Sequence, residues 1–533
     1  MTDPPSPPPG APPAGSSPPG APAAAPAGAP AWAAHLPAGV APGDVDLLAR
    51  RTLPAAWADR WRARPDRPVI RPPGGTWLTG ADLLARTAAV AGRLAAAGLV
   101  PGDRVVMAGG PSADLVVAHC AALRAGLVVV PVNPAYSERE LGVIVADAEP
   151  RAALLDDGRL RAWARTLGPG VVVAGTDVAL PGPAAGGGPP LDATGPADPA
   201  LLPYTSGTTG TPKGALLTHG NLLASTEALL LAWRWTGDDR LIHCLPLFHM
   251  HGLGVGLHGT LLAGASAVLL PRFEPEAVLA AAADPDLGAT LFFGVPTMYA
   301  RLAGAPGVER LGGLRLCVSG SAPLSAGLHH RLAEATGQRV VERYGMTETV
   351  MLVSNPVDGE RRPGTVGLPL PGVEVRLDHR GATGTGEILV RGPNVFGGYW
   401  RRPDATAEAI VDGWFRTGDI GTFDGDGYLS IVGRAKELII TGGYNVYPRE
   451  IEDLLRSHAS VVDVAVVGTP SEEWGEVVTA YVEPGPGFDA GALTAWAAPQ
   501  LAPYKRPRVV HAVDALPRNP MGKVVRDRLR PPD

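Results

Sequence analysis

A run of small hydroxyl and glycine residues ahead of a single lysine is the part of the sequence best suited to hold an anion. Residues 204–214 read YTSGTTGTPKG, so five Ser or Thr residues and two glycines precede Lys213. Glycine lets the backbone approach a ligand closely and turn its N–H groups toward an anion. Hydroxyl groups and a lysine add donors for phosphate oxygens. The order differs from the Walker loop, G-x-x-x-x-G-K-[ST], so we expect a phosphate-binding loop of another type.

The choice of basic residues makes each lysine informative. Of 46 Lys and Arg residues, only four are lysine: Lys213, Lys436, Lys505 and Lys523. A compact ammonium group does what a planar guanidinium cannot. Because the chain uses arginine almost everywhere else, we expect lysine to be kept where its chemistry is needed.

Helical and strand-like segments alternate around these residues. The alternating segments are 81–97, 103–107, 113–124 and 127–132. Ser137 and Glu140 then form a capping box that opens a further helix. Helix and strand in regular alternation predict a layered α/β domain.

The pattern changes in the C-terminal part of the chain. Beyond residue 364 it shows short strands between Gly, Pro and Asp turns, and from about Arg434 it is typical of a small α+β domain. The fold class that we predict is a large layered α/β N-terminal domain with a small mobile α+β C-terminal domain. The predicted boundaries are a disordered tail at 1–42, the large domain at 43–433 and a lid domain at 434–533.

The composition excludes several classes of protein. A length of 533 residues suggests two to four domains, at roughly 150 residues per domain. An apolar content of 45% excludes global disorder. A net charge of −6, with no long basic stretch, makes nucleic acid a poor partner. Cys120, Cys244 and Cys317 are too far apart for a disulfide scaffold or a zinc ribbon, which fits a reducing compartment.

Two segments bear on whether the chain has a targeting peptide or a membrane-spanning helix. Residues 1–42 are almost entirely Pro, Ala, Gly and Ser, which predicts an extended, disordered tail rather than a signal or transit peptide. Residues 252–271 are uncharged, but they contain His258 and five glycines, which favours a buried turn, helix and strand over a membrane span. We therefore expect a cytoplasmic protein without stable membrane insertion.

Six motifs in a fixed order carry a resemblance to a known family. They are residues 204–214, RYGMTE at 343–348, TGD at 417–419, GR at 433–434, GGYN at 442–445 and PRNPMGK at 517–523. Together they resemble the adenylate-forming superfamily of acyl-CoA synthetases, firefly-type luciferases and peptide-synthetase adenylation domains. The match runs from about residue 45 to 530. It implies an enzyme that makes an acyl-adenylate from a carboxylate and Mg-ATP, releases diphosphate and passes the acyl group to a thiol.

The resemblance also implies which residues bind ATP. That set comprises Thr205, Ser206, Gly207, Thr208, Thr209, Gly210, Lys213, Gly320, Ser321, Ala322, Tyr344, Gly345, Thr347, Asp419, Arg434 and Lys523. Tyr344 would stack on adenine, Asp419 would accept both ribose hydroxyls, and Thr347 would contact the α-phosphate. Glu348 would ligate Mg2+, a hard cation that prefers oxygen ligands. Lys523 would bridge the reacting carboxylate and the α-phosphate.

By the same resemblance, the small domain changes its position between the two half-reactions. Lys523 lies in another predicted domain than Lys213, so the lid must close for adenylation. The family then rotates the lid about a hinge, here Lys436, which is therefore counted among the catalytic residues. That rotation would bring Gly442, Gly443 and Tyr444 in to line the entry of coenzyme A.

The acid is predicted from three local features, at residues 248–251, 294–301 and 318–321, which resemble malonyl-CoA synthetases. Malonate would keep one carboxylate that does not react, and burying it unpaired would be costly. Arg301 is the predicted cation for it, with Ser321 and His251 as further donors and Met346 beside them. The predicted reaction joins malonate, ATP and CoA into malonyl-CoA, AMP and diphosphate.

Other functions remain open at this point. One is a CoA synthetase for another short or aromatic acid, and another is a luciferase-like monooxygenase of the same fold. A non-catalytic binding protein is disfavoured because Lys523 and Glu348 are both present. The predicted partners are small molecules alone.

Overall fold

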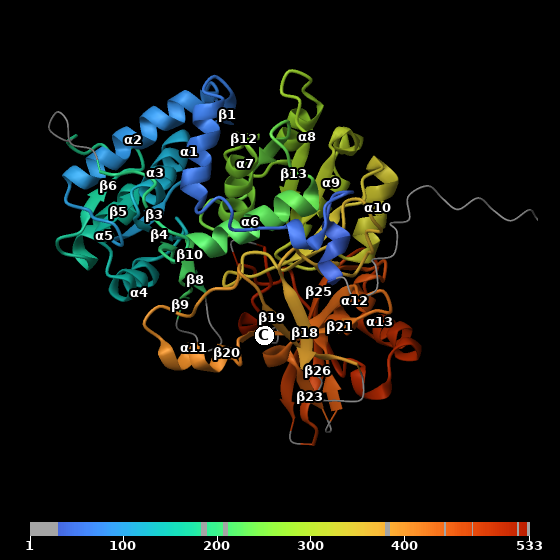
Figure 1. Ribbon diagram of the computed structural model, residues 1–533. Helices are drawn as coiled ribbons and strands as arrows, with labels where there is room; N and C mark the ends of the chain where they lie inside the picture. The colour runs from blue at the N-terminus through green and yellow to red at the C-terminus, as the bar shows by residue number, and fades with distance from the viewer. Residues whose placement is uncertain are drawn as a thin grey trace, which may run out of the picture.

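A computed structural model describes residues 30–182, 189–205, 212–378, 384–441, 444–471, 473–519 and 522–529. It has a large N-terminal part, blue to yellow in Figure 1, and a smaller C-terminal part, orange to red. The predicted fold class, a large α/β domain followed by a small one, is confirmed. The predicted boundaries between them stay a prediction.

Two large sheets form the N-terminal part. The first runs in the order β10 (Leu217–Thr218), β7 (Pro199–Leu201), β4 (Val128–Pro131), β3 (Arg104–Ala108), β5 (Ala152–Leu155) and β6 (Val172–Ala174). The second runs in the order β17 (Leu368–Pro369), β16 (Val353–Ser354), β15 (Val341–Tyr344), β14 (Leu316–Ser319), β13 (Leu291–Gly294), β11 (Arg240–His243), β12 (Ser266–Leu269), β1 (Pro68–Arg71) and β2 (Leu78–Thr79). Pairing is parallel from β4 to β6 and from β1 to β15, as expected for strands joined by helices.

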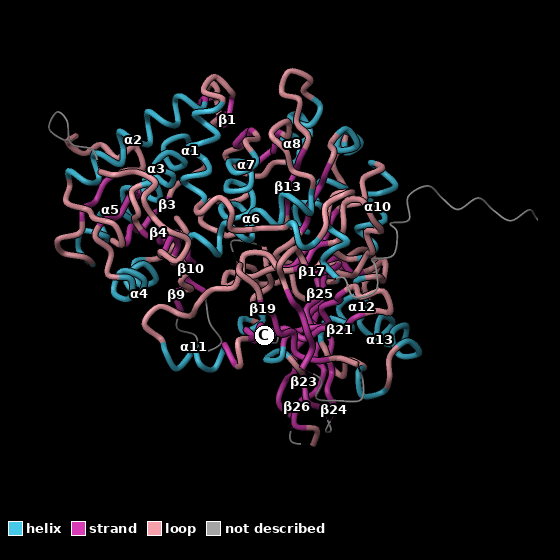
Figure 2. The backbone as a smooth tube through the Cα atoms, in the orientation of Figure 1, coloured by secondary structure: helices cyan, strands magenta, loops and turns pink. Residues whose placement is uncertain are grey.

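Helices follow most of these strands and are visible as cyan tubes in Figure 2. In the large part they are α1 (Leu53–Ala63), α2 (Gly80–Ala96), α3 (Ala113–Arg124), α4 (Glu138–Ala148), α5 (Gly158–Leu167), α6 (His219–Trp233), α7 (His258–Ala263), α8 (Pro275–Ala283), α9 (Pro296–Ala303), α10 (Ala326–Thr336) and α11 (Pro403–Ala409). The Ser137–Glu140 capping box is present at the start of α4, as predicted.

The two sheets share one central hydrophobic core, because successive side chains along each strand point to opposite faces of the sheet. On β3, Val105 and Met107 lie in the central hydrophobic cluster, whereas Val106 and Ala108 pack on the outer side, against residues of α4 and α5. On β14, Leu316 and Val318 lie in the same central cluster, and Cys317 packs on the opposite side with residues of α8, α9 and α10. Residues of α1, α3 and α6 fill the space between, so each sheet is covered on both faces.

Strands in mainly antiparallel pairing build the C-terminal third. One sheet runs β18 (Glu374–Asp378), β19 (Gly386–Arg391), β21 (Trp414–Phe423), β20 (Ile410–Val411), with β22 (Leu429–Arg434) beside β21. The other runs β24 (Tyr444–Val446), β23 (Ile439–Thr441), β26 (Gly475–Pro484), β25 (Val461–Ser471), with β27 (Val509–Ala512) beside β26. Helices α12 (Pro448–Arg456) and α13 (Ala490–Ala497) pack on this second sheet. Strands β21, β25 and β26 are longer than the short strands that the sequence predicted, and β27 pairs parallel with β26.

The apolar stretch at residues 252–271 folds as a buried unit of the large part. A π-helix at His251–Leu257 continues into α7 and then into β12. Among the described residues, no helix combines the length and the apolar character needed to cross a membrane. The cysteines Cys120, Cys244 and Cys317 are all buried and free.

The described chain begins inside the segment predicted as a tail. A 3-10 helix at Ala31–His35 packs beside β17, where the buried imidazole of His35 lies 3.1 Å from the carbonyl oxygen of Leu368. Arg234 donates hydrogen bonds to the carbonyls of His35 and Leu36. Residues 1–29 lie outside the described part of the chain.

Candidate active site

The carboxyl ends of four parallel strands bring the motifs of the sequence to one edge of the larger sheet. Strands β11, β13, β14 and β15 are neighbours there. Residues 244–251, helix α9, the turn at 320–322 and residues 345–348 follow these strands in turn. The crevice beyond the carboxyl ends of such strands is where ligands bind in open α/β sheets.

Asp419 is the centre of a buried polar group on the side of β15 and β21. The hydroxyl of Tyr344 donates to its Oδ2 at 2.6 Å, and Nε of Arg434 lies 3.0 Å from its Oδ1. Asp419 and Arg434 face each other across β21 and β22. Burial and the Asp419 charge hold the pKa of Tyr344 well above its usual range, so it stays a donor. The predicted ribose and adenine residues therefore lie together.

Glu348 and Lys213, the lysine of the predicted phosphate loop, share Tyr399 as a neighbour. The carboxylate of Glu348 is buried, and burial raises its pKa. The hydroxyl of Tyr399 donates to Glu348 Oε1 at 3.0 Å, and Lys213 Nζ stands 5.4 Å from the centre of the Tyr399 ring. Tyr399 lies outside the motifs quoted from the sequence.

The phosphate loop is described only at its two ends. Thr205 on β8 (Tyr204–Thr205) pairs with Lys213 on β9 (Lys213–Gly214). The predicted ligands Ser206, Gly207, Thr208, Thr209 and Gly210 lie outside the described residues.

Residues 345–347 fill the turn between Tyr344 and Glu348. Gly345 packs so tightly against the backbone that a Cβ there would lie 2.2 Å from the carbonyl oxygen of Val350. Met346 packs against the central core, and Thr347 is half-buried. The contact of Thr347 with the α-phosphate stays a prediction.

Lys523 reaches this edge from the C-terminal part of the chain. It follows a tight turn in which its own backbone N–H donates to Asn519 Oδ1 at 3.0 Å. Burial, with the nearby Arg434 charge second, lowers its pKa to about 8, and Glu437 and Asp419 oppose that shift. The Lys523 ammonium is therefore within electrostatic range of Asp419 and Arg434.

The turn that carries Lys523 also lies against the acid side of the site. A Cβ on Gly522 would lie 3.1 Å from Thr297 Oγ1, in the first turn of α9. The C-terminal part of the chain is thus closed over the large part.

Ser321 and His251 meet on the acid side of the site. Ser321 Oγ lies 3.3 Å from His251 Nδ1, and Ser321 has a left-handed backbone with φ of 70°. Burial holds the pKa of His251 well below its usual range, so the imidazole is neutral at pH 7. Glu342 accepts the Leu324 N–H at 2.9 Å and so anchors the chain just after Gly320, Ser321 and Ala322.

Arg301 does not have the buried position that its predicted role suggested. It lies in the last turn of α9 and is exposed, with its guanidinium carbon 5.0 Å from the centre of the Phe273 ring. Thr297 lies one helical turn earlier on the same face. Its role as the anion-binding residue stays a prediction.

Sequence reasoning missed the buried cation on this side of the site, Arg343. The residue is 5% exposed, and its Nε and Nη2 have no hydrogen-bond partner within the described part of the chain. Its guanidinium lies directly on Gly320, where a Cβ would come within 2.4 Å of Cζ. Its charge also acts on His249 and His251. The available signal was a charged residue at the end of a strand whose residues are all buried.

The predicted hinge and CoA residues lie further along the chain. Lys436 is exposed in a 3-10 turn at Ala435–Glu437, directly after β22. Gly442 and Gly443 lie outside the described residues, and for Tyr444 the structure describes the backbone alone, in β24.

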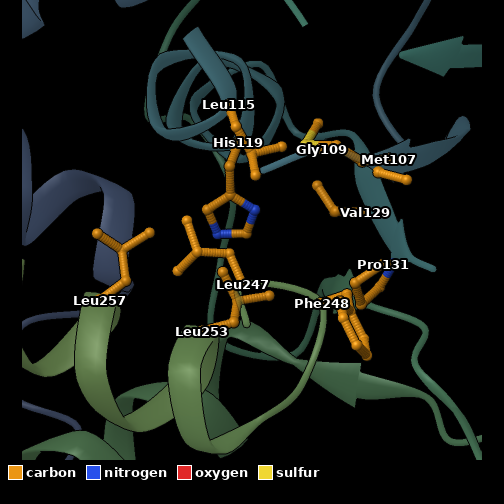
Figure 3. Close-up of a pocket in the computed structure, with 11 residues that line it drawn as sticks. Met107, Gly109, Leu115, His119, Val129, Pro131, Leu247, Phe248, Leu253 and Leu257 are labelled. Carbon is orange, nitrogen blue, oxygen red and sulfur yellow. The ribbon is translucent and has the colours of Figure 1, made fainter. Parts of the chain in front are cut away.

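A small cavity next to residues 245–257 is too small to bind a carboxylic acid substrate. It lies between β3, α3 and this segment and is lined mainly by apolar side chains, with His119 the polar group (Figure 3). Its volume is about 10 Å³, which leaves room for at most one water molecule. We interpret it as a packing gap in the core.

Comparison with known proteins agrees with this arrangement. The sequence pattern of the AMP-binding enzyme family matches residues 57–400, and that of the AMP-binding enzyme C-terminal domain matches residues 450–523. The chain belongs to the AMP-binding enzyme family. The adenylate-forming resemblance drawn from the motifs is thereby confirmed.

Relatives of this AMP-binding enzyme act on different acids. Feruloyl-CoA synthase of Amycolatopsis sp is 40% identical over 496 residues, which are 88% of this chain and 97% of that protein. Malonate–CoA ligase of Arabidopsis thaliana is 40% identical over 369 residues, 62% of this chain and 60% of that one. ATP-bound MatB from Rhodopseudomonas palustris has a TM-score of 0.83 at 41% identity and covers 89% of this chain and 98% of its own.

These relatives fix the reaction type and leave the acid open. The protein is an AMP-forming acyl-CoA synthetase, an acid–thiol ligase that uses ATP and CoA. Equal identity to a feruloyl and a malonate enzyme means that sequence similarity does not select between an aromatic and a short dicarboxylic acid.

Proposed function

We propose that this acyl-CoA synthetase is a malonate–CoA ligase, which forms malonyl-CoA, AMP and diphosphate through a malonyl-adenylate. The observation that carries the proposal is the guanidinium of Arg343, which is buried near Ser321 and His251 and whose Nε and Nη2 have no hydrogen-bond partner among the described residues. Burial lowers the pKa of Arg343 to about 9, so the group is still charged at pH 7.

A buried charge without a partner is costly, and an anion delivered by the substrate removes that cost. Malonate offers such an anion, because one of its two carboxylates reacts and the other stays ionised at pH 7. Neutral His251 and the hydroxyl of Ser321 supply further polar contacts. A fatty chain would instead bring apolar surface against the cation, and ferulate carries no second carboxylate to pair with it.

In the adenylation step, the residues around Asp419 would orient the nucleotide. Asp419 and Arg434 would hold the ribose, Tyr344 would stack on adenine, and Thr347 with Lys523 would contact the α-phosphate. Lys523 would also contact the reacting carboxylate and stabilise the charge that builds on phosphorus.

The phosphate loop, ending at Lys213, would hold the β- and γ-phosphates. The carboxylate of Glu348 fits a hard cation, and the described residues contain no group of three or more His, Cys, Asp or Glu that could hold a metal alone. By the resemblance, Glu348 would hold Mg2+, which would neutralise phosphate charge. In the second step the lid would rotate about Lys436, and Gly442, Gly443 and Tyr444 would line the path of the CoA thiol.

The experiment that tests the proposal measures diphosphate release with malonate, propionate, butyrate and ferulate. We expect malonate to be preferred. Arg343→Met should lower malonate turnover by a factor of roughly 10² or more, the scale of losing the partner of a buried charge. It should spare propionate turnover, and because methionine removes an unpaired buried charge, the fold should stay at least as stable.

Arg301→Met is the matched variant, at the other arginine on the same side of the site. If it, rather than Arg343→Met, abolishes malonate turnover, Arg301 is the anion-binding residue and malonate remains the acid. If the unaltered enzyme prefers ferulate or a monocarboxylate, the malonate proposal is wrong.

A further inference from the structure

Residues 396–400 connect the phosphate loop with Glu348. On one side, the N–H of Phe396 donates to the carbonyl oxygen of Glu348 at 2.9 Å. On the other, the N–H of Trp400 donates to the carbonyl oxygen of Gly214 at 2.8 Å, and Ala215 and Tyr399 form an antiparallel bridge. The same five residues are therefore bonded to both parts of the predicted ATP site.

Tyr399 is the residue of this segment whose side chain contacts both. Its hydroxyl donates to Glu348 Oε1 at 3.0 Å, while Lys213 Nζ stands 5.4 Å from its ring centre. Within the described part of the chain, Lys213 has no carboxylate partner within ion-pair distance. The face of the tyrosine ring is its electrostatic partner, a contact worth about 0.5–2 kcal/mol depending on exposure.

The surroundings of Tyr399 fix its position. Its backbone N–H donates to Thr406 Oγ1 at 2.9 Å, and its ring packs edge-on against Phe396 with ring centres 4.8 Å apart. Gly398 has φ of 146°, and a Cβ there would lie 2.5 Å from Thr406 Cγ2. Because these contacts fix the Tyr399 ring, the ring can in turn orient Glu348 and Lys213.

We propose that Tyr399 is a positioning residue that couples the phosphate loop to the magnesium-binding carboxylate. Its hydroxyl fixes the orientation of Glu348 by occupying one carboxylate oxygen, and its ring holds the ammonium group of Lys213 beside that carboxylate. Phosphates and Mg2+ then meet a preformed pair of groups. The inference rests on the ATP-site roles proposed for Lys213 and Glu348 and does not depend on which acid is used.

Calorimetric titration with ATP separates the contact of the Tyr399 hydroxyl with Glu348 from that of its ring with Lys213. The full-length protein is titrated with and without Mg2+, and no acid is present. In Tyr399→Phe the ring remains, so affinity for metal-free ATP should stay within about twofold. The gain in affinity that Mg2+ gives should fall roughly 5- to 10-fold, the scale of one typical net hydrogen bond. In Tyr399→Leu the ring is lost too, so metal-free ATP should also bind several-fold more weakly.

Two controls distinguish positioning from a general structural role. AMP lacks the β- and γ-phosphates, so its affinity should be unchanged in both variants. Tyr428→Phe removes a hydrogen bond of similar length, 2.9 Å to the carbonyl of Glu360, outside the site and should match the unaltered enzyme. The proposal is overturned if Tyr399→Phe retains the full Mg2+ effect, if AMP binding falls as much as ATP binding, or if Mg2+ has no effect on the unaltered enzyme.

Discussion

The surroundings of Lys523 lower the pKa of its ammonium group. Its ammonium is half-buried and stands near the guanidinium of Arg434, which together lower its pKa to about 8. The proposed chemistry needs the charged form, because negative charge develops on phosphorus in the transition state. The group is therefore active below its pKa and loses its proton as pH rises.

For the adenylation half-reaction, we expect kcat/KM for ATP to fall as pH rises through about 8. The ratio reports groups of the free enzyme, so it is the quantity that senses this pKa. ATP–diphosphate exchange measures it. Lys523→Arg stays charged across the range, so this variant should be slower but should lack the fall near pH 8. A fall that persists in Lys523→Arg would assign the titration to another group.

At the scale of elements, helix α6 fixes how the large part meets the C-terminal strands. Thr218 and Asn221 form a capping box at its start. Asn221 Nδ2 also donates to the carbonyl oxygens of Pro393 and Val395 at 2.8 and 2.9 Å. This one side chain thus joins the helix to residues 393–395, which lead into the segment that holds Tyr399.

Asn221→Asp should destabilise the fold by about 1–3 kcal/mol, as much as or more than Asn221→Ala. Aspartate keeps the capping acceptor but places an oxygen against two carbonyl oxygens where a donor stood. Thermal unfolding measures both variants. If the cap alone matters, Asn221→Asp will instead melt like the unaltered protein.

At the scale of the whole molecule, the C-terminal part packs against the large part at the predicted site. A Cβ on Gly522 would lie 3.1 Å from Thr297 Oγ1, and the charges of Asp419 and Arg434 act on Lys523. In the proposed mechanism this arrangement would serve adenylation, and the second step would require these contacts to separate. The exposed 3-10 turn around Lys436 is the connection about which the lid would rotate.

Lys436→Pro and Lys523→Ala should therefore have opposite effects. Proline fixes φ near −65° and should hold the hinge in one state, so ATP–diphosphate exchange survives while CoA ester formation falls roughly 10-fold or more. Lys523→Ala should abolish exchange yet still convert pre-made acyl-adenylate to the thioester. Assays of the two half-reactions measure both. Normal rates of both steps in Lys436→Pro would show that the hinge lies elsewhere.

Local signals in the sequence predicted many of the elements, and the motifs supplied a hypothesis for the nucleotide site. Runs of apolar residues predicted buried strands such as β4 because a strand covered on both faces needs them, and the Ser137–Glu140 pair predicted the start of α4. Motif order gave the family, and the structure brings Tyr344, Asp419 and Arg434 into contact. For these residues, the type and the local spacing already determine the chemistry.

Only the tertiary structure decided which side chains are buried and which residues from distant parts of the chain they contact. From the sequence we assigned Arg301 to the acid and gave Arg343 no role. Folding leaves Arg301 exposed over Phe273 and buries Arg343 against Gly320, with Nε and Nη2 lacking a hydrogen-bond partner in the described part of the chain. It likewise brings Tyr399 to Glu348 and Lys213, from positions far apart in the chain. Which side chains lose water and which charges meet depends on the packing of distant elements, and neither helical nor strand periodicity encodes that.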